Sequence, residues 1–277
     1  MTNARELPAG YLAGLQGDAK RGEYIFAAAG CASCHLAPEA DWAAGSLPAL
    51  PGGRRFPSPF GTFIAPNIST DTTAGIGAWS DRDIVRAITL GASPEGSHYY
   101  PAFPYASFQR AASSDIADLI AYLRTLPAVS STPPPHEVGF PFNIRRTLAF
   151  WKALFTNPAP VLPDPLPDDI ARGRYLVEAL GHCGECHTPR NALGGLKRTA
   201  WLGGAPHPSG EGRIPNITSA SLNWSIEEIA AYLQSGFTPE FDVAGGKMIE
   251  VIANTSRLSD DDRMAIARYL KAVPPVE

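Results

Sequence analysis

The chain carries one short motif twice, as Cys31-Ala32-Ser33-Cys34-His35 and as Cys183-Gly184-Glu185-Cys186-His187. In both copies Cys-x-x-Cys is followed at once by His, which is the pattern of covalent c-type haem attachment. Two thiols at this spacing can form thioethers with one haem, and the next residue can supply its imidazole to the iron. The motifs predict that four cysteines attach two haem c groups: Cys31, Cys34, Cys183 and Cys186. The histidines that follow them, His35 and His187, are the predicted proximal iron ligands.

Three other chemistries use paired cysteines. A zinc ribbon joins two Cys-x-x-Cys motifs that are typically about 15–20 residues apart, and these two motifs are much farther apart than that. A redox dithiol does not need the following His, and a disulfide inside Cys-x-x-Cys closes too small a loop to stabilise the fold much. We therefore expect haem, with zinc or a redox dithiol as the alternatives.

The composition sets limits on the class of protein. A length of 277 residues suggests one large or two ordinary domains. Apolar residues make up 44% of the chain, charged residues 18%, and the formal net charge is −4, which excludes a nucleic-acid binder that works through overall basic charge. The sequence has no apolar run long enough to span a membrane, and we expect a signal segment to be absent from this chain, since the first ten residues do not form one.

The sequence around each motif is itself repeated in the same order. The repeat consists of an Arg-Gly pair, the haem motif, a Pro-Asn-Ile segment and a final helix containing Tyr-Leu. The paired segments are Arg21-Gly22 and Arg172-Gly173, Pro66-Asn67-Ile68 and Pro215-Asn216-Ile217, and Tyr122-Leu123 and Tyr269-Leu270. Each glycine is expected to let the last helix of its half approach closely, with the tyrosine as its partner.

Helix signals support a mainly α fold with long loops, duplicated in a pseudo-twofold manner. Ser80 with Asp83, Ser225 with Glu228 and Ser259 with Asp262 have the spacing of capping boxes. Asp18 and either Asp168 or Asp169 are the expected N-caps of the helices that precede the motifs. No convincing alternating strand pattern is present.

The predicted domains are residues 14–127 with the first haem and residues 168–277 with the second. Between them, residues 128–167 form a proline-rich linker. Its stretch 140–155 has the pattern of a short amphipathic helix, which is expected to pack across the domain interface, with docking to a membrane surface or a partner as the alternative.

The second axial ligand differs between the halves. Methionine is a common second ligand of haem iron in cytochromes c, and Met248, in a glycine-rich loop, is the predicted distal ligand of the second haem. The first half has no methionine in the equivalent region. His98 is the candidate distal ligand of the first haem, and a tyrosinate from Tyr99, Tyr100 or Tyr105, or an open position, are the alternatives.

Several stretches besides the motifs resemble a known family: 21–24, 62–71, 73–80, 101–105 and 181–190. With these stretches the chain resembles the cytochrome c subunits of periplasmic, membrane-associated bacterial dehydrogenases that oxidise alcohols, sorbitol or gluconate. The resemblance implies two tandem, class I-like cytochrome c domains. Those subunits typically have three haem domains, whereas this chain has two haem motifs. Their first-domain loop also has Met where this chain has Phe103, so the family's methionine ligand carries over at Met248 alone.

The resemblance implies a di-haem cytochrome that transfers electrons from a periplasmic dehydrogenase to a downstream respiratory acceptor, a cytochrome or an oxidase. The chain is expected to be a carrier or an electron-transfer subunit rather than an enzyme. The alternative is a haem enzyme or sensor, peroxidase-like or binding a small ligand at the first haem. We expect a periplasmic location, no nucleic-acid partner, and membrane association that is only indirect or made through a removed N-terminal segment.

Overall fold

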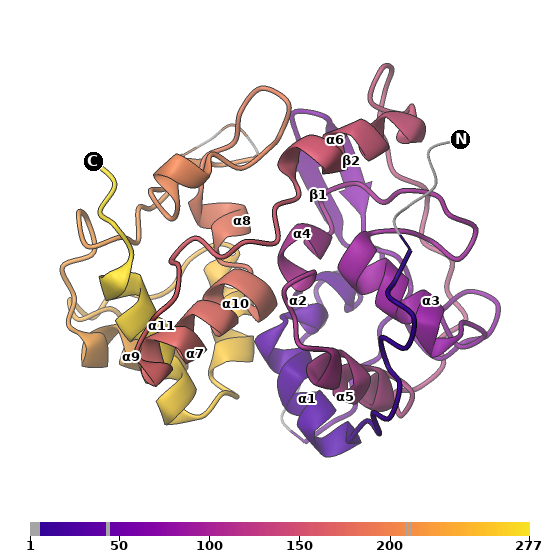
Figure 1. Cartoon of the computed structure of the whole chain (residues 1–277), viewed down its shortest axis with the longest axis horizontal. Coiled ribbons are helices and arrows are strands. Elements are labelled where there is room, and N and C mark those ends of the chain that lie inside the picture. Colours follow the sequence, from indigo (N-terminus) through magenta and orange to yellow (C-terminus); the bar gives the residue numbers. More distant parts are fainter. Residues whose placement is uncertain (1–5, 43–44, 209, 211) are drawn as a thin grey trace. The chain divides into compact units, whose positions relative to one another are not determined.

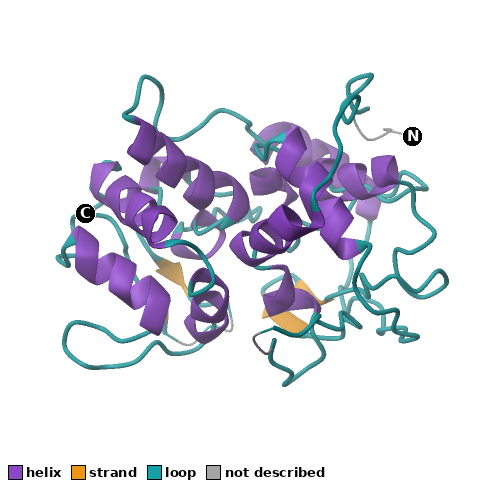
Figure 2. Cartoon of the chain, turned by 90° about the horizontal axis from the view of Figure 1, so that it is seen from below, coloured by secondary structure: helices purple, strands orange, loops and turns teal. Residues whose placement is uncertain are grey.

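The computed structural model describes residues 6–42, 45–208, 210 and 212–277. The chain divides into two compact units, Met1–Thr156 and Asn157–Glu277, and the boundary falls inside the predicted linker. Helices predominate in both units, and the strands are few and short (Figure 2). The prediction of a mainly helical fold is confirmed.

The first unit contains helices, a hairpin and a C-terminal helical segment (Figure 1). Its elements in chain order are α1 (Ala19–Ala28), α2 (Cys31–His35), β1 (Arg55–Ser58), β2 (Gly61–Ile64), α3 (Asp81–Val85), the π-helix η1 (Arg86–Leu90), α4 (Tyr105–Phe108), α5 (Ser113–Leu123), the 3-10 turn η2 (Arg145–Thr147) and α6 (Leu148–Phe155). Strands β1 and β2 pair antiparallel, with Arg55 opposite Ile64 and Ser58 opposite Gly61. The sequence pattern did not indicate this hairpin because its strands are only four residues long.

The second unit has a similar order of elements. They are α7 (Asp168–Tyr175), the π-helix η3 (Leu176–Leu180), α8 (Gly184–His187), the 3-10 turn η4 (Arg198–Ala200), β3 (Ala205–Pro206), β4 (Arg213–Ile214), α9 (Ile226–Ser235), α10 (Met248–Thr255) and α11 (Asp260–Ala272). Strands β3 and β4 pair antiparallel over two residues each.

Each unit is built on one close helix crossing at the predicted glycine. In the first unit α1 packs on α5, and a Cβ added at Gly22 would collide with the carbonyl of Asp118 and lie 2.8 Å from the Cβ of Tyr122. In the second unit α7 packs on α11, and a Cβ at Gly173 would collide with the carbonyl of Ala265. Only glycine permits backbones to approach this closely, so the crossing requires it.

Capping residues set where several helices begin. Ser80 and Asp83 form a capping box on α3, and Ser225 and Glu228 form one on α9, as predicted. Asp18 caps α1 by accepting the N–H groups of Lys20 and Arg21.

Two of the capping predictions turned out differently. Ser259 caps α11 by accepting the N–H of Asp262. The carboxylate of Asp262 accepts two hydrogen bonds from the distant Arg172, at 2.8 and 2.7 Å. For α7 the predicted cap is wrong: Pro167 occupies the N-cap, and Asp168 is already the first helical residue. The carboxylate of Asp168 still lies in the first turn of α7, where its negative charge interacts favourably with the positive end of the helix dipole.

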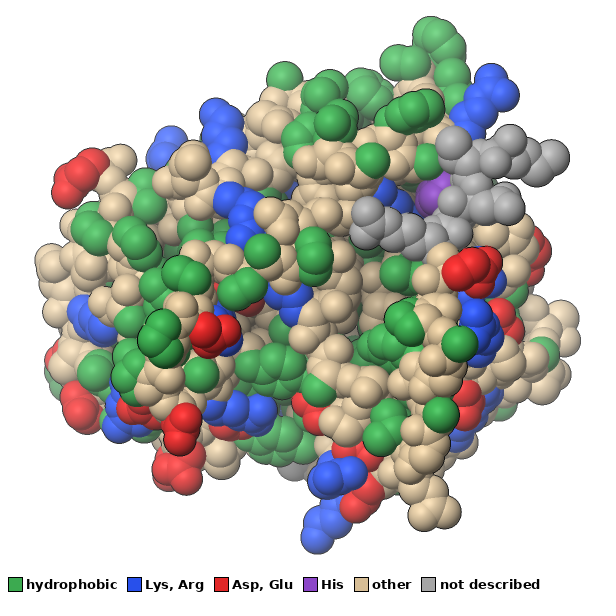
Figure 3. Space-filling view, viewed as in Figure 1, with side chains coloured by type: hydrophobic (Ala, Val, Ile, Leu, Met, Phe, Trp, Pro, Cys, Tyr) green, Lys and Arg blue, Asp and Glu red, His purple; other side chains and the backbone are tan. Residues whose placement is uncertain are grey.

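The predicted amphipathic stretch forms η2 and α6, which belong to the first unit. Leu148 is buried against Phe63 and Tyr100. Other apolar side chains of the segment are exposed: Phe140 is 81% exposed, Phe150 68% and Leu154 71%. In the space-filling view apolar side chains gather over α6 at the upper edge (Figure 3). In the part of the chain that the structure describes, no helix combines the length and the apolar character needed to cross a bilayer.

Candidate functional site

The first Cys-x-x-Cys-His motif forms a helix of its own. Gly30 adopts a left-handed conformation with φ of 63° and separates α1 from α2, which consists of the five motif residues. His35 is buried, and its Nδ1 lies 2.8 Å from the carbonyl oxygen of Pro66. Because a carbonyl only accepts, Nδ1 carries the proton and Nε2 keeps a free lone pair. Burial lowers the pKa of His35, so the ring stays neutral and able to bind a metal.

The second motif has the same arrangement. Cys183 is the N-cap residue of α8, and His187 ends the helix. His187 is buried, its Nδ1 lies 2.8 Å from the carbonyl oxygen of Pro215, and burial lowers its pKa. The structure therefore presents two neutral imidazoles, each with Nε2 available as a ligand atom.

The repeated Pro-Asn-Ile segments hold these two proline carbonyls in place. Asn67 Nδ2 donates to the carbonyls of Val129 and Ser131 at 2.7 and 2.8 Å, and its Oδ1 accepts the N–H of Ser69. In the other unit Asn216 Nδ2 donates to Val276 O at 2.7 Å. The asparagines tie their proline loops to the segments that follow α5 and α11, which explains why the Pro-Asn-Ile segment is repeated.

The cysteines do not fit the alternative chemistries well. The four cysteines form no disulfide in the structure. Burial raises the pKa of Cys31 and of Cys183 to about 12, whereas a redox dithiol depends on a lowered thiol pKa. Across the described ranges, no group of three or more His, Cys, Asp or Glu side chains is placed to hold a metal ion.

The donor set fits a covalently attached haem. Each motif brings two thiols and one imidazole together on one short helix, with Cys183 at the N-cap of the second. Thiols suit thioether attachment, and an imidazole with a free Nε2 suits the iron. In the second motif the indole of Trp201 packs so closely on Gly184 that a Cβ there would collide with it, so the apolar wall of the site requires glycine at this motif position.

An arginine supports each motif, which the sequence patterns did not indicate. Arg54 donates to three carbonyls, those of Ser33 at 3.0 Å, Ala37 at 3.1 Å and Ala40 at 2.5 Å. In the second unit Arg190 donates to the carbonyl and the carboxylate of Glu185, at 3.1 and 2.5 Å. Ser33 and Glu185 occupy the same motif position. The two arginines come from different points of the repeat, so no sequence alignment of the halves would pair them.

The second unit also holds a buried carboxylate. Glu178 is 1% exposed and accepts the hydroxyl of Tyr269 at 2.6 Å and the N–H of Val161 at 2.8 Å. The hydroxyl of Tyr269 accepts the indole N–H of Trp201 at 3.1 Å. The signal in the sequence is a single acidic residue inside the apolar run Leu176–Leu180, which forms the π-helix η3. This network links the chain before α7 to the tryptophan that covers the second motif.

The loops expected to carry the second axial ligands correspond residue by residue. In the first unit Gly91 is followed by a bridge between Ala92 and His98, and the N–H of Tyr99 donates to Gly91 O at 2.7 Å. In the second, Gly236 is followed by a bridge between Phe237 and Val243, and the N–H of Ala244 donates to Gly236 O at 2.8 Å.

The correspondence continues to the predicted ligand. The N–H of Met248 donates to Gly245 O at 3.2 Å, and the N–H of Phe103 donates to Tyr100 O at 3.1 Å. Phe103 therefore occupies the same place after the bridge of the first unit as Met248 does after the bridge of the second. Met248 is the first residue of α10.

His98 lies on the bridge rather than at the ligand position. It is buried, its counterpart Val243 is 61% exposed, and its Nδ1 lies 3.1 Å from Nζ of Lys152. The structure thus places His98 beside an ammonium group from α6, a contact that the sequence did not indicate.

The three tyrosines of this loop have different surroundings. Burial raises the pKa of Tyr99 to about 12, so its phenol stays protonated near neutral pH. The hydroxyl of Tyr100 donates to the carbonyl of Phe142 at 3.1 Å. The ring of Tyr105 is buried beneath Gly91, with Lys152 Nζ 4.5 Å from its centre.

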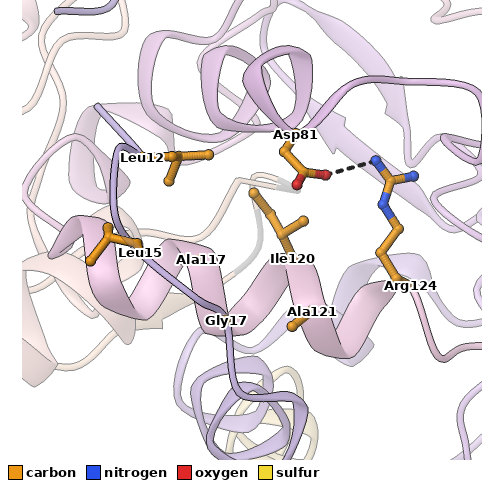
Figure 4. A pocket seen from close by; sticks show the side chains of 8 residues that line it. All are labelled: Leu12, Leu15, Gly17, Asp81, Ala117, Ile120, Ala121 and Arg124. Atoms are coloured by element: carbon orange, nitrogen blue, oxygen red, sulfur yellow. Dashed lines mark hydrogen bonds and ion pairs between the residues drawn. The ribbon is translucent and has the colours of Figure 1, made fainter. Parts of the chain in front are cut away.

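A separate pocket in the first unit contains no residue of either motif. Leu12, Leu15 and Gly17 of the N-terminal segment line it on one side, and α5 lines it on the other (Figure 4). At its edge Arg124 pairs with Asp81 at 3.0 Å. Its lining offers no thiol or imidazole, so it is unrelated to the candidate haem sites.

Comparison with known proteins gives consistent relatives. A family model described as cytochrome c matches residues 19–127. Over 265 residues the chain is 54% identical to a protein named diheme cytochrome c-type from Cereibacter sphaeroides, and the match covers 96% of this chain and 89% of that protein.

Two other relatives are parts of dehydrogenases. The chain is 38% identical to a nicotinate dehydrogenase subunit of Pseudomonas putida and 38% identical to the fructose dehydrogenase cytochrome subunit of Gluconobacter japonicus, in both cases over 92% of its length. It spans 21% of the first of these proteins and 52% of the second. The matches confirm the resemblance that the motifs predict.

Proposed function

This chain belongs to the di-haem c-type cytochromes, and on that premise we propose that it transfers electrons between a periplasmic dehydrogenase and a downstream respiratory acceptor. One observation carries the proposal: each unit holds two thiols beside a buried imidazole whose Nδ1 is bonded to a proline carbonyl. Two equivalent sites in one chain suit a relay of single electrons, and a carrier or an electron-transfer subunit needs no further catalytic group.

Under this proposal the motifs hold two covalently bound haem c groups. Cys31, Cys34, Cys183 and Cys186 would form the thioethers, His35 and His187 would each supply an imidazole to one iron, and Met248 would supply a thioether sulfur to the second. When bound, haem supplies a one-electron couple at iron. The chain's own residues orient the imidazoles through Pro66 and Pro215, exclude water by burial, and support the motifs through Arg54 and Arg190.

We also propose that each unit contains one of two tandem, duplicated cytochrome c domains, residues 14–127 and 168–277, joined by the segment 128–167, most of which belongs to the first unit. The parallel contacts support it: a glycine at the helix crossing, a proline carbonyl on the motif histidine, and an asparagine that ties the proline loop. Between its Arg-Gly pair and its haem motif, the second half has one residue more than the first. This extra residue coincides with the π-helix η3, and a π-helical turn is the usual way in which a helix absorbs an insertion.

The names of the relatives support a proposal for the donor and the compartment. Two of them are subunits of dehydrogenases by name, and we propose a dehydrogenase as the electron donor. A cytochrome or an oxidase is the proposed acceptor. Thioether attachment of haem takes place outside the cytoplasm in bacteria, as the family implies, so the proposed location is the periplasm.

Haem content and reversible reduction test the function. We expect the protein matured in a bacterium with haem-attachment machinery to carry two haems per chain and to cycle between ferric and ferrous forms without turnover of substrate. The double variant Cys31→Ala/Cys34→Ala and its counterpart Cys183→Ala/Cys186→Ala should each lose one haem. A colourless protein, or one that binds zinc through these cysteines, would overturn the proposal.

A further inference from the structure

The two units differ at one loop position that is otherwise equivalent in both. Met248 and Phe103 occupy corresponding places after corresponding bridges, and both N–H groups close the same turn, onto Gly245 O and Tyr100 O. The carbonyl of Phe103 also accepts the N–H of Tyr105 at 2.8 Å, which fixes the position of Phe103 in the loop. Phenylalanine has no atom that binds iron, so the ligand position of the first unit holds a residue that cannot be a ligand.

The predicted ligand His98 is engaged by a lysine of α6. Lys152 Nζ lies 2.7 and 2.6 Å from the carbonyls of Leu90 and Gly91 and 3.1 Å from Nδ1 of His98. An ammonium group only donates, so Nδ1 of His98 accepts and the proton of the neutral ring is on Nε2. This is the opposite tautomer to that of His35 and His187, and it leaves His98 without a ring lone pair to give to iron.

The tyrosine and methionine alternatives are also limited. The hydroxyl of Tyr100 donates to Phe142 O, and the ring of Tyr100 packs on Phe63 at 5.1 Å and on His136 at 5.4 Å. The first unit has no methionine apart from Met1, which lies outside the described residues. A protein ligand from these residues would require the loop to give up contacts that it makes in the structure.

The surroundings of Phe103 are aromatic. Its ring centre lies 6.3 Å from that of Tyr99 and 5.8 Å from that of Phe108. These aromatic neighbours suit a small neutral ligand, because such a ligand needs no charged partner when it is buried.

We propose that the first haem site keeps an open sixth position beside Phe103 and binds a small neutral diatomic molecule there, whereas Met248 closes the second site. The inference rests on the proposed function in one respect, that both motifs carry haem. It assigns to the first site a binding role that simple electron carriage does not need.

Carbon monoxide titration of the reduced protein tests the proposal, with the two positions exchanged as matched variants. We expect one carbon monoxide per chain for the wild type, none for Phe103→Met and two for Met248→Phe. His98→Ala should bind one, as the wild type does. Haem content by pyridine haemochrome and helical circular dichroism verify that each variant is folded and loaded.

Each other outcome is decisive. A wild type with two haems that binds no carbon monoxide overturns this inference and leaves electron transfer standing, and gain of binding in His98→Ala or Tyr99→Phe would then identify the protein ligand. Phe103→Met that still binds one carbon monoxide overturns the equivalence of Phe103 and Met248. A wild type without haem on the first motif overturns both this inference and the proposed function.

Discussion

At the scale of single residues, the direction of one hydrogen bond decides what a histidine can do. His35 and His187 donate from Nδ1 to a proline carbonyl, which leaves Nε2 free for iron. His98 accepts at Nδ1 from Lys152, which places its proton on Nε2. All three residues are buried, so burial alone does not distinguish a ligand from a structural histidine.

A methionine variant tests the distal assignment in the second unit. Met248→Ala should abolish the weak long-wavelength band of methionine-bound ferric haem. It should also lower the potential of one haem, because methionine ligation raises it. We expect a shift of at least about 59 mV, a tenfold change for one electron, measured by spectroelectrochemical titration.

The other described methionine provides the control. Met264 lies within α11, and Met264→Ala should keep both the band and the potentials. Persistence of the band in Met248→Ala would show that another side chain is the distal ligand.

At the scale of elements, glycine crossings and capping residues determine how each helix is placed. The crossing of α1 and α5 depends on Gly22, since any side chain there meets the backbone of Asp118. The start of α1 depends on Asp18, whose carboxylate accepts two backbone N–H groups.

The first element-scale prediction concerns the crossing. Gly22→Ala should lower the free energy of unfolding by about 1–3 kcal/mol through overpacking, in spite of the higher helix propensity of alanine. Gly139→Ala is the matched control, because a Cβ at Gly139 meets nothing within 4 Å. Urea unfolding followed by circular dichroism measures the difference, and equal stability of the two variants would contradict the crossing seen in the structure.

The second element-scale prediction concerns the pH dependence of the N-cap of α1. Hydrogen bonds from the N–H groups of Arg21 and Lys20 lower the pKa of Asp18 below its ordinary value of 3.8. A lowered pKa in the folded state means that the charged cap stabilises the fold above that ordinary value, and that this contribution is lost as the pH falls through the folded pKa. The thermal midpoint of Asp18→Ala should therefore lie below that of the wild type at pH 7. The difference between the two midpoints should become smaller below about pH 4.

The asparagine variant separates capping from charge. Asn is also a good N-cap but does not titrate, so Asp18→Asn should retain most of the stability and lose the pH-dependent part. A gap between the wild type and Asp18→Ala that is the same at pH 3 and pH 7 would contradict the role of the carboxylate charge.

At the scale of the whole molecule, the chain combines two similar units that carry different residues, Phe103 and Met248, at one equivalent loop position. The proposed haems would then have different ligation, and therefore different potentials. Reduction of the wild type should proceed in two one-electron steps, with the first haem at the lower potential because it lacks methionine. Phe103→Met should move the lower step toward the higher one, as a redox titration would measure. Two coincident steps in the wild type would contradict this difference between the sites.

The two motifs could be recognised from local spacing because each consists of neighbours within five residues. For the same reason the capping boxes at Ser80 and Ser225 could be predicted, whereas the glycine crossings could be predicted from the repeat, which pairs Gly22 with Gly173. The support of the motifs by Arg54 and Arg190, the network of Glu178 with Tyr269 and Trp201, and the contact of Lys152 with His98 could not. These interactions join residues that are distant in the chain or that do not correspond in the repeat, and their partners become neighbours only when the helices and loops pack.

The sequence alone therefore determined that the chain has two haem motifs, a mainly helical fold and an asymmetry between Met248 and Phe103. The tertiary structure decided which nitrogen of each histidine carries the proton, and that His98 lies away from the ligand position. The physical reason is that a motif specifies which groups are available, whereas the tautomer and position of a side chain depend on the donor or acceptor that packing places beside it.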